Sequence, residues 1–308
     1  MSFKGLGDRF PPADRQEAMP LQELLTVVVR SVGERTTGAC LNLLSTLVPS
    51  EQIILVREVP FSRAMRRGFE AALELGRKWT LVVDADTLVL PGFAQEITLF
   101  AQRQQANAFV VQGVVFDKFF NLLRPAGNHL YRTRHLQKAL ECIPEEGCTL
   151  RPETHMIGEM VRRGYLFIQK PFLAGLHDFE QQYLDIARKC FLHAHKHEPH
   201  WLEPILPVWQ RRQAADKDYV AALAGIAAGR AHRGAVFVNA DFLEQQVASA
   251  LDATQLGAKS RLTRDAWPAV RVAQACRDWL ADPECERMQP IMFPLEFWDR
   301  LEGMGSQR

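Results

Sequence analysis

The 308-residue sequence predicts an α/β fold in which a mixed sheet is flanked by helices and followed by a mostly helical C-terminal region. Between Leu21 and about Gly175, short apolar runs alternate with amphipathic helical segments, as they do in sheets that carry helices on their faces. After Asp178 the chain is rich in Ala, Leu, Gln and Arg and shows little strand pattern. We therefore expect a flexible lead-in at 1–20, a sheet domain at 21–178 and a helical region at 179–308.

Three short apolar runs predict the first strands of the sheet. LLTVVV ends at Arg30, QIILV ends at Arg57, and TLVV ends at Asp84. The runs are continuous and contain many β-branched residues, which is typical of strands buried on both faces. The later runs NAFVVQGVVF and YLFIQKPFLAG predict two more strands.

Amphipathic segments predict the helices that connect and follow these strands. Between the second and third strands, Met65, Phe69 and Leu73 recur at helical spacing. Ser62 is placed to cap this helix. The segment THMIGEMVRR predicts a second helix that stops at the glycine after it. Asp178 is placed as the N-cap of a third helix, which opens the C-terminal region.

Composition limits the class of partner. Lys plus Arg number 37 against 36 Asp plus Glu, so no basic excess indicates nucleic acid. The six cysteines are scattered without a C-x-x-C pair, which favours a reducing compartment, and we expect a cytoplasmic protein. The apolar stretch YVAALAGIAAG has about half the length that spans a bilayer. We expect no transmembrane segment, while peripheral membrane association and the oligomeric state stay open.

The tripeptide Asp84-Ala85-Asp86 directly follows the third predicted strand. In an extended segment the two carboxylates would leave the same face, about 6 to 7 Å apart. Two like charges held this close call for a cation beside them, and carboxylates are the ligands that Mg2+ and Mn2+ prefer. Acidic pairs at strand ends also serve as turn and cap residues, so both interpretations stay open at this point.

The strands, the helix and the D-A-D motif together resemble the nucleotide-sugar-binding half of the glycosyltransferase A fold, and are nearest to family-2-like glycosyltransferases. The resemblance covers roughly 21–178. It implies a Mn2+ or Mg2+ ion that bridges the diphosphate of a nucleotide-sugar donor and stabilises the leaving group as a Lewis acid. It also implies the metal ligands Asp84, Asp86 and His177, the last of which follows the final core strand. The acceptor would be a glycan, a lipid-linked molecule or a small molecule, and bacterial surface glycan synthesis is a setting suggested by analogy alone.

The resemblance further implies where the donor binds. Open α/β sheets bind ligands at the carboxyl ends of their strands. Arginines of the helix after the second strand could reach the diphosphate, although a solvated helix face explains them equally well. The residues implied are Arg30, Ser31, Val32 and Glu34 after the first strand, Glu58 after the second, Asp84 and Ala85, and Arg63, Arg66 or Arg67.

A candidate for the catalytic base comes from the same resemblance. Family-2 transferases often carry a Glu-Asp pair about eleven residues before a Gly-Tyr pair, and Glu153 stands at that distance before Gly164. The chain departs from the pattern, because Arg151-Pro152-Glu153 replaces the usual Gly-Glu-Asp. Glu153 could act as a general base or could be a first-turn helix carboxylate, with Glu159 as the fallback. If Glu153 lies elsewhere, a retaining route is open.

The segment FLHAHKHEPH resembles a metal-binding tract, because it contains His193, His195, His197 and His200. On a helix only His193 with His197, and His197 with His200, share a face. Neither a carboxylate nor a cysteine completes an evident zinc set. A basic rim near the acceptor, or a site for a phosphate-bearing partner, fits the segment as well.

Three other functions are weighed against the transferase. The motif VVDADTLV is similar to that of haloacid-dehalogenase-type phosphatases, but Leu88 stands where that motif needs Thr or Val. A nucleotidyltransferase would usually have a glycine-rich basic loop after the first strand, and RSVGERTTG has only two glycines. A non-catalytic protein that binds sugar nucleotides is the third alternative.

Overall fold

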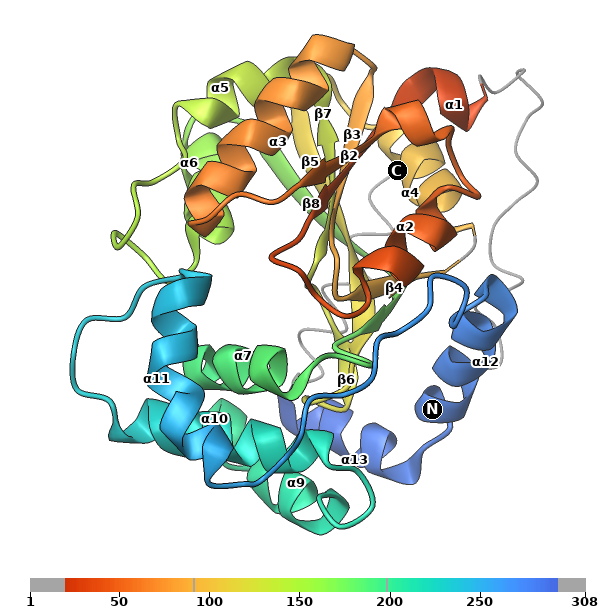
Figure 1. Cartoon of the computed structure of the whole chain (residues 1–308). Helices are drawn as coiled ribbons and strands as arrows, with labels where there is room; N and C mark the ends of the chain where they lie inside the picture. The colour runs from red at the N-terminus through yellow and green to blue at the C-terminus, as the bar shows by residue number, and fades with distance from the viewer. Residues whose placement is uncertain (1–19, 91, 198, 293–308) are drawn as a thin grey trace.

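The computed structural model describes residues 20–90, 92–197 and 199–292. The predicted lead-in therefore lies, except for Pro20, outside the described residues. A central sheet carries helices on both faces, and the C-terminal helices gather at one end of it (Figure 1). Among the described residues, no helix has both the length and the apolar character needed to cross a membrane.

The sheet confirms the predicted mixed α/β fold class. Strands β1 (Leu25–Arg30), β2 (Ile53–Val56) and β3 (Trp79–Asp84) are parallel, as are β5 (Ala108–Asp117) and β8 (Leu166–His177). These are the five predicted strands. Short antiparallel strands that the sequence did not indicate complete the eight-stranded sheet, whose order is β2-β1-β3-β7-β5-β8-β4, with β6 on β5. The additional strands are β4 (Thr87–Val89), β6 (Leu122–Arg124) and β7 (Asn128–Arg132).

Alternation along the central strands decides which helices cover each face. Val27 and Val29 of β1 pack in the core beneath α2 and α4, whereas Val28 packs in a second core beneath α3, α5 and α6. Because successive side chains of a strand point to opposite faces, one apolar strand serves both cores. The bounds are α1 Leu21–Leu24, α2 Thr37–Leu44, α3 Phe61–Leu75, α4 Phe93–Gln102, α5 Leu136–Leu140 and α6 Pro152–Arg162, with 3-10 turns at Ser50–Gln52 and Thr133–His135.

The C-terminal region is helical, as predicted. Helices α7 to α10 share a core with Phe119 and Phe120 of the turn between β5 and β6, and with Leu122 of β6. Trp267 and Val272 instead pack with residues of β5 and β8, so the chain returns to the sheet near its end. The bounds are α7 Tyr183–Lys196, α8 Pro199–Leu202, α9 Leu206–Arg212, α10 Asp218–Ala231, α11 Ala240–Asp252, α12 Ala269–Leu280 and α13 Pro283–Met292. The domain boundary at 178/179 stays a prediction.

Two predicted helix caps are wrong. Pro60 is the N-cap of α3, and Ser62 is buried inside the first turn. Gln182, not Asp178, is the N-cap of α7. Asp178 instead has a φ of 67°, and its backbone N–H donates to the carbonyl oxygen of Asp86 at 3.1 Å. This contact turns the chain back toward the D-A-D motif.

The register of the sheet places the D-A-D segment beside the end of β8. Thr87 of β4 pairs with His177 of β8, and Val89 pairs with Gly175. Gly175 has a φ of 148°, and a Cβ there would lie 2.0 Å from the carbonyl oxygen of Leu88. Glycine is therefore required for β4 to approach β8.

We expect two helical glycines to respond oppositely to substitution by alanine. A Cβ on Gly225 of α10 would lie 2.3 Å from the carbonyl oxygen of Ala187 in α7, whereas one on Gly158 would meet only Arg162, at 3.8 Å. Gly225→Ala should lower the free energy of unfolding by about 1 to 3 kcal/mol through overpacking. Gly158→Ala should raise it by about 0.5 to 1 kcal/mol through helix propensity. Urea unfolding followed by circular dichroism measures both, and equal responses would contradict the close approach of α7 and α10.

Candidate functional site

A cavity of about 800 Å³ opens at the carboxyl ends of β1 and β3. Its walls come from the ends of these strands, the β6–β7 loop, the start of α6 and one face of α7. Ligands of open α/β sheets bind in this position, and ligand pockets commonly have volumes of roughly 300 to 1,000 Å³.

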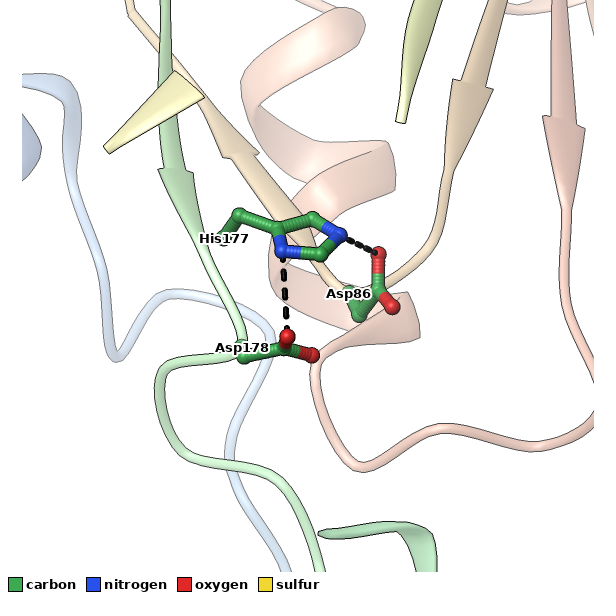
Figure 2. A group of neighbouring side chains, drawn as sticks. All are labelled: Asp86, His177 and Asp178. Carbon is green, nitrogen blue, oxygen red and sulfur yellow. Dashed lines mark ion pairs between the residues drawn. The ribbon is translucent and has the colours of Figure 1, made fainter. Parts of the chain in front are cut away.

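Asp86, His177 and Asp178 form a compact triad in the wall of this cavity (Figure 2). The His177 ring lies between the two carboxylates, with Nε2 3.5 Å from Asp86 Oδ1 and Nδ1 3.0 Å from Asp178 Oδ2. One ligand atom from each residue lies within 4.8 Å of the others. Among the described residues, this is the group of acidic, His and Cys side chains close enough to hold a metal ion.

The triad fits a divalent cation. Asp86 Oδ1 and Asp178 Oδ2 are buried, and each has an ion-pair contact with a ring nitrogen of His177 but no hydrogen bond of good geometry from a described residue. A buried carboxylate oxygen without a hydrogen bond costs free energy, which a cation would offset. Two carboxylates and one imidazole are a donor set that suits Mn2+, and also Mg2+ through the oxygens. Asp86 and His177 were predicted as ligands, whereas Asp178 was predicted as a helix cap.

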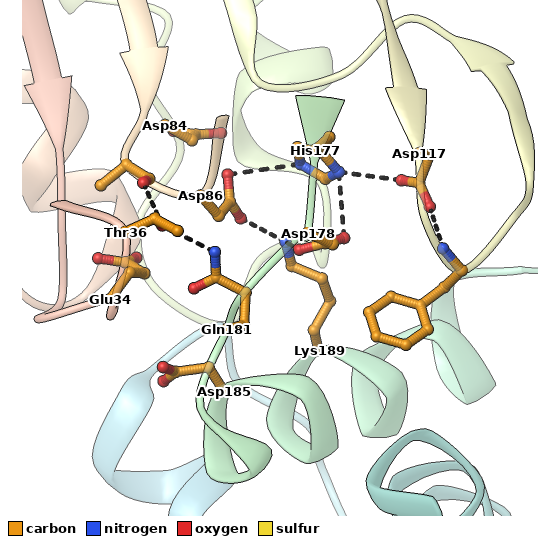
Figure 3. A network of polar contacts seen from close by, with 12 residues as sticks. Glu34, Thr36, Asp84, Asp86, Asp117, His177, Asp178, Gln181, Asp185 and Lys189 are labelled. Atoms are coloured by element: carbon orange, nitrogen blue, oxygen red, sulfur yellow. Dashed lines mark hydrogen bonds and ion pairs between the residues drawn. The ribbon is translucent and has the colours of Figure 1, made fainter. Parts of the chain in front are cut away.

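Lys189 of α7 already supplies a positive charge to the triad. Its Nζ contacts both Asp86 Oδ2 and Asp178 Oδ1 (Figure 3). Burial raises the pKa of Asp86, but attraction to Lys189 and His177 outweighs burial and lowers this pKa to about 2. For His177, burial lowers the pKa, and attraction to Asp178 and Asp86 raises it to about 9. The ammonium group and a metal ion would therefore compete for the same two carboxylates.

Asp117, at the end of β5, orients the imidazole. Its Oδ2 lies 2.9 Å from His177 Nδ1 and accepts a 2.7 Å hydrogen bond from Arg124 Nε. An ionised carboxylate only accepts, so Nδ1 carries a proton. Because the pKa of His177 is about 9, Nε2, which faces Asp86, is also protonated near neutral pH and would have to lose that proton to bind a metal ion. Partners of this kind fix the tautomer of a metal-binding histidine. Asp117 was not predicted as a site residue, although it ends a predicted strand as Asp84 does.

Asp84 does not join the triad. Strand β3 ends at Asp84 and the chain turns directly after it, so the extended geometry expected for the D-A-D motif does not continue to Asp86. Asp84 instead accepts a 2.8 Å hydrogen bond from Nε of Arg30, its partner on β1. Burial raises the pKa of Asp84, which Arg30 counteracts. The predicted role of Asp84 as a metal ligand has no support in this geometry.

Glu153, the predicted base, is held by Arg30. The two guanidinium nitrogens of Arg30 donate to the two oxygens of Glu153 at 3.0 and 3.1 Å, and Tyr131 donates to the same carboxylate at 2.7 Å. Burial raises the pKa of Glu153, but Arg30, His129 and these hydrogen bonds lower it to about 2. A carboxylate with so low a pKa is a weak base near neutral pH. The fallback, Glu159, lies outside the cavity lining and pairs with Arg162.

The loop after β1 is a compact hydrogen-bonded turn in the cavity wall. Ser31 Oγ donates to Glu34 at 2.6 Å, and the backbone N–H of Val32 donates to the same oxygen at 2.9 Å. Burial and the nearby charge of Asp86 raise the pKa of Glu34 to about 7. Of the predicted donor-binding residues, those that line the cavity are Arg30, Ser31, Val32, Glu34, Glu58 and Asp84.

Four predicted donor contacts lie outside the cavity lining, namely Arg63, Arg66, Arg67 and Ala85. Arg63 is 66% exposed, and its nearest carboxylate is Glu58, at 4.0 Å. Arg66 donates to two backbone carbonyl oxygens after α5, at 3.0 and 2.8 Å, and so joins α3 to that loop. Ala85 is fully buried, and its carbonyl oxygen accepts a 2.7 Å hydrogen bond from Thr36. Their helical or turn positions direct them away from the strand ends.

The histidine tract is divided between the cavity and the surface. His193 and His197 line the cavity, with ring centroids 5.0 Å apart. His195 stacks on Phe191 instead, and His200 is exposed. The helical spacing predicted the pairing of His193 with His197, and neither belongs to the metal-capable group found among the described residues.

No family model matches the chain, and no curated protein matches it. Several solved structures resemble it in fold. A mannosyltransferase from Pyrobaculum calidifontis, in complex with GDP-Man and Mn2+, is 12% identical, with a TM-score of 0.38 over 90% of this chain and 87% of that one. A glycosyltransferase involved in the glycosylation of the major capsid of PBCV-1 is 14% identical, with a TM-score of 0.35 over 48% and 82%.

A cytidylyltransferase from Leptospira borgpetersenii is 10% identical, with a TM-score of 0.36 over 63% of this chain and 95% of that one. Because the identities and TM-scores are low, the roles of individual residues rest on the chain's own contacts.

We expect Glu34 to make stability depend on pH. Its pKa is raised above the unfolded value, so the folded state keeps the proton longer and loses stability as the pH rises through about 7. Glu34→Gln should therefore gain stability relative to the wild type between pH 5 and pH 8, by about 1 to 3 kcal/mol. Urea unfolding with chelator present measures this difference. Glu58→Gln, at a cavity residue whose side chain is 42% exposed, is the control. A difference independent of pH would contradict the burial of Glu34.

Proposed function

We propose that the protein is a metal-dependent glycosyltransferase that takes a sugar from a nucleotide-diphosphate donor. The observation that carries the proposal is the Asp86–His177–Asp178 triad, with two buried carboxylate oxygens that accept no hydrogen bond, in the wall of the 800 Å³ cavity at the strand ends. Departure of a nucleoside diphosphate develops negative charge on phosphate oxygens. A divalent cation, when bound, stabilises that charge as a Lewis acid.

In this proposal each wall of the cavity has a separate task. Asp86, Asp178 and His177 Nε2 hold Mn2+ or Mg2+, and Asp117 keeps the imidazole in the required tautomer. The nucleotide lies along the ends of β1 and β2, where the Ser31–Glu34 turn offers hydroxyl, amide and carboxylate groups. The C-terminal helices, which supply the opposite wall, face the acceptor, whether this is a glycan, a lipid-linked molecule or a small molecule.

Arg30 is the preorganised cation of the donor side. Its side chain is only 4% exposed, lines the cavity, and is fixed by Asp84 on one side and Glu153 on the other. A guanidinium held in this way cannot rearrange freely, which suits a charge meant to meet a diphosphate. We therefore propose that Glu153 orients Arg30, in place of the role of base predicted for it.

Thermal unfolding with a panel of nucleoside diphosphates tests the proposal without knowledge of the acceptor. With Mn2+ present, one diphosphate should raise the melting temperature by several degrees, because ligand at about 100 times its Kd stabilises the folded state by about 2.7 kcal/mol. Chelator should remove the shift, and so should Asp86→Asn and His177→Gln.

Asp84→Asn is the matched control for the D-A-D motif. Because Asp84 contacts Arg30 and lies outside the triad, this variant should keep the shift that Mn2+ alone produces. If Asp84→Asn lost that shift and Asp86→Asn kept it, the metal would bind Asp84 and not Asp86, which would contradict the proposed site. The absence of a shift with any nucleotide would rule out the proposed donor class.

We also expect Lys189 to oppose metal binding. Lys189→Met removes the ammonium group that contacts Asp86 and Asp178 and leaves two buried carboxylates without it. The melting temperature in chelator should fall, and the affinity for Mn2+, measured by calorimetry, should rise about tenfold, which corresponds to about 1.4 kcal/mol. Lys138→Met, on the exposed surface of α5, should change neither quantity. Weaker Mn2+ binding by Lys189→Met would show that the ammonium group supports the metal.

A further inference from the structure

Basic side chains gather at one end of the cavity, whereas the carboxylates of the lining lie elsewhere and are mostly paired with cations. Carboxylates of the triad and of the Ser31–Glu34 turn lie toward β1 and the start of α7. Toward the end of α7 the lining becomes basic, with contributions from the end of β6, the residue before α6 and the last turn of α7. We call this the basic end of the cavity; it consists of Arg124, Arg151, His193, Lys196 and His197.

One face of α7 connects the triad to the basic end. Lys189, Leu192, His193 and Lys196 all line the cavity, at the spacing of one helix face. Lys196 follows Lys189 by seven residues, so it lies about 10 Å further along the helix axis. The basic end is therefore about 10 Å away from the proposed metal site, inside the same cavity.

The two central cations of the basic end have no carboxylate partner. In the described part of the chain, no carboxylate forms an ion pair with Lys196 or Arg151; Arg151 Nη2 instead donates to the backbone oxygen of Lys196 at 2.6 Å. The nearby carboxylates are occupied, since Asp117 binds Arg124 and His177, and Glu153 binds Arg30.

Two further observations indicate a missing anion. His193 is 6% exposed, and both of its ring nitrogens are buried without a hydrogen-bond partner, although the residue lines the cavity. Burial, followed by repulsion from Arg151, Lys189 and Arg124, lowers the pKa of Lys196 to about 7. Like charges crowded into a partly buried wall are unfavourable unless a ligand of opposite charge joins them.

We propose that the basic end binds a phosphate ester group of the acceptor. Arg151 and Lys196 supply charge-assisted hydrogen bonds, and His193 supplies a ring nitrogen, which together suit the several oxygens of a phosphate. The assignment of this phosphate group to an acceptor rests on the proposed function, whereas the existence of the phosphate site does not. The phosphate places the acceptor so that a hydroxyl group about 10 Å away lies near the metal triad.

The same chemistry has two sources, a water-soluble phosphate ester and a lipid phosphate. Leu192, Trp201 and Leu243 line the cavity together with the basic end, so an apolar chain attached to the phosphate has a surface to contact. Glycerol 1-phosphate and octyl phosphate represent the two sources and share the same charged group.

Calorimetric titration of the full chain with inorganic phosphate, glycerol 1-phosphate and octyl phosphate, in chelator, tests the site. The wild type should bind at least one of the three, and Lys196→Gln and Arg151→Gln should each weaken binding about tenfold or more. Lys138→Gln and Arg63→Gln, at exposed positions outside the cavity, are the matched controls and should bind like the wild type. An absence of binding, or equal loss in the controls, would overturn the proposal.

The melting temperature distinguishes a variant that has lost its fold from one that has lost only the phosphate site. Because the charge of Lys196 is crowded by like charges, Lys196→Gln should melt at the same temperature as the wild type or higher at pH 7, without phosphate. A variant that melts higher and yet binds phosphate more weakly has lost a ligand contact and not its fold. A lower melting temperature together with unchanged phosphate affinity would show a structural lysine and overturn the proposal.

A second titration separates the phosphate site from the donor site. With metal and a saturating nucleoside diphosphate, glycerol 1-phosphate or octyl phosphate should still bind. Displacement by the nucleotide would overturn the proposal, because the basic end would then hold the donor's diphosphate. If the protein binds phosphate through Lys196 but binds no nucleotide, the proposed transferase function is refuted and the phosphate site is upheld.

Preference for octyl phosphate indicates a lipid phosphate, and preference for glycerol 1-phosphate indicates a soluble ester.

Discussion

The pairing of β4 with β8 is the constraint on which the whole site depends. It aligns Thr87 with His177, so that residues about ninety positions apart along the chain meet at one edge of the sheet. The approach is so close that position 175 accepts only glycine, because a Cβ there would overlap the backbone of Leu88. The hydrogen bond from Asp178 N–H to Asp86 O continues this contact past the end of both strands. Backbone pairing alone thus brings the three residues of the triad close together.

Buried charge at the site is tolerated because it is distributed over several partners. His177 contacts three carboxylates, and Lys189 contacts two of them. Removing a charged group from water is costly, and close ion pairs offset that cost only when nearly every charge has a partner. Arg30 follows the same rule with Asp84 and Glu153. The oxygens that lack hydrogen bonds in this network are therefore informative, since they lie where a further cation fits.

Local sequence patterns predicted much of the fold but only part of the candidate site. The strands β1, β2, β3, β5 and β8 were predictable because each is a continuous apolar run, whereas β4, β6 and β7 are short and rely on pairing with distant strands. The family resemblance indicated Asp86 and His177, which the structure brings together, while their role as metal ligands stays a prediction. Lys189 could not be predicted, because nothing in an amphipathic helix indicates which of its lysines faces two carboxylates. The role of Glu153 as a base stays a prediction, and its low pKa could not be foreseen because it depends on Arg30, 123 positions away.

The glycines of α10 have a consequence for how the site responds to ligands. Gly225 and Gly229 bring α10 against the backbone of Ala187 and Phe191, so α7 is clamped along the side opposite to the cavity. A helix held backbone to backbone has little room to slide or rotate. Lys189 can therefore leave Asp86 and Asp178 only by rotation about the four bonds of its own side chain. In the proposed metal-bound state the ammonium group would then leave through a rotamer change of Lys189, without movement between the sheet and the C-terminal helices.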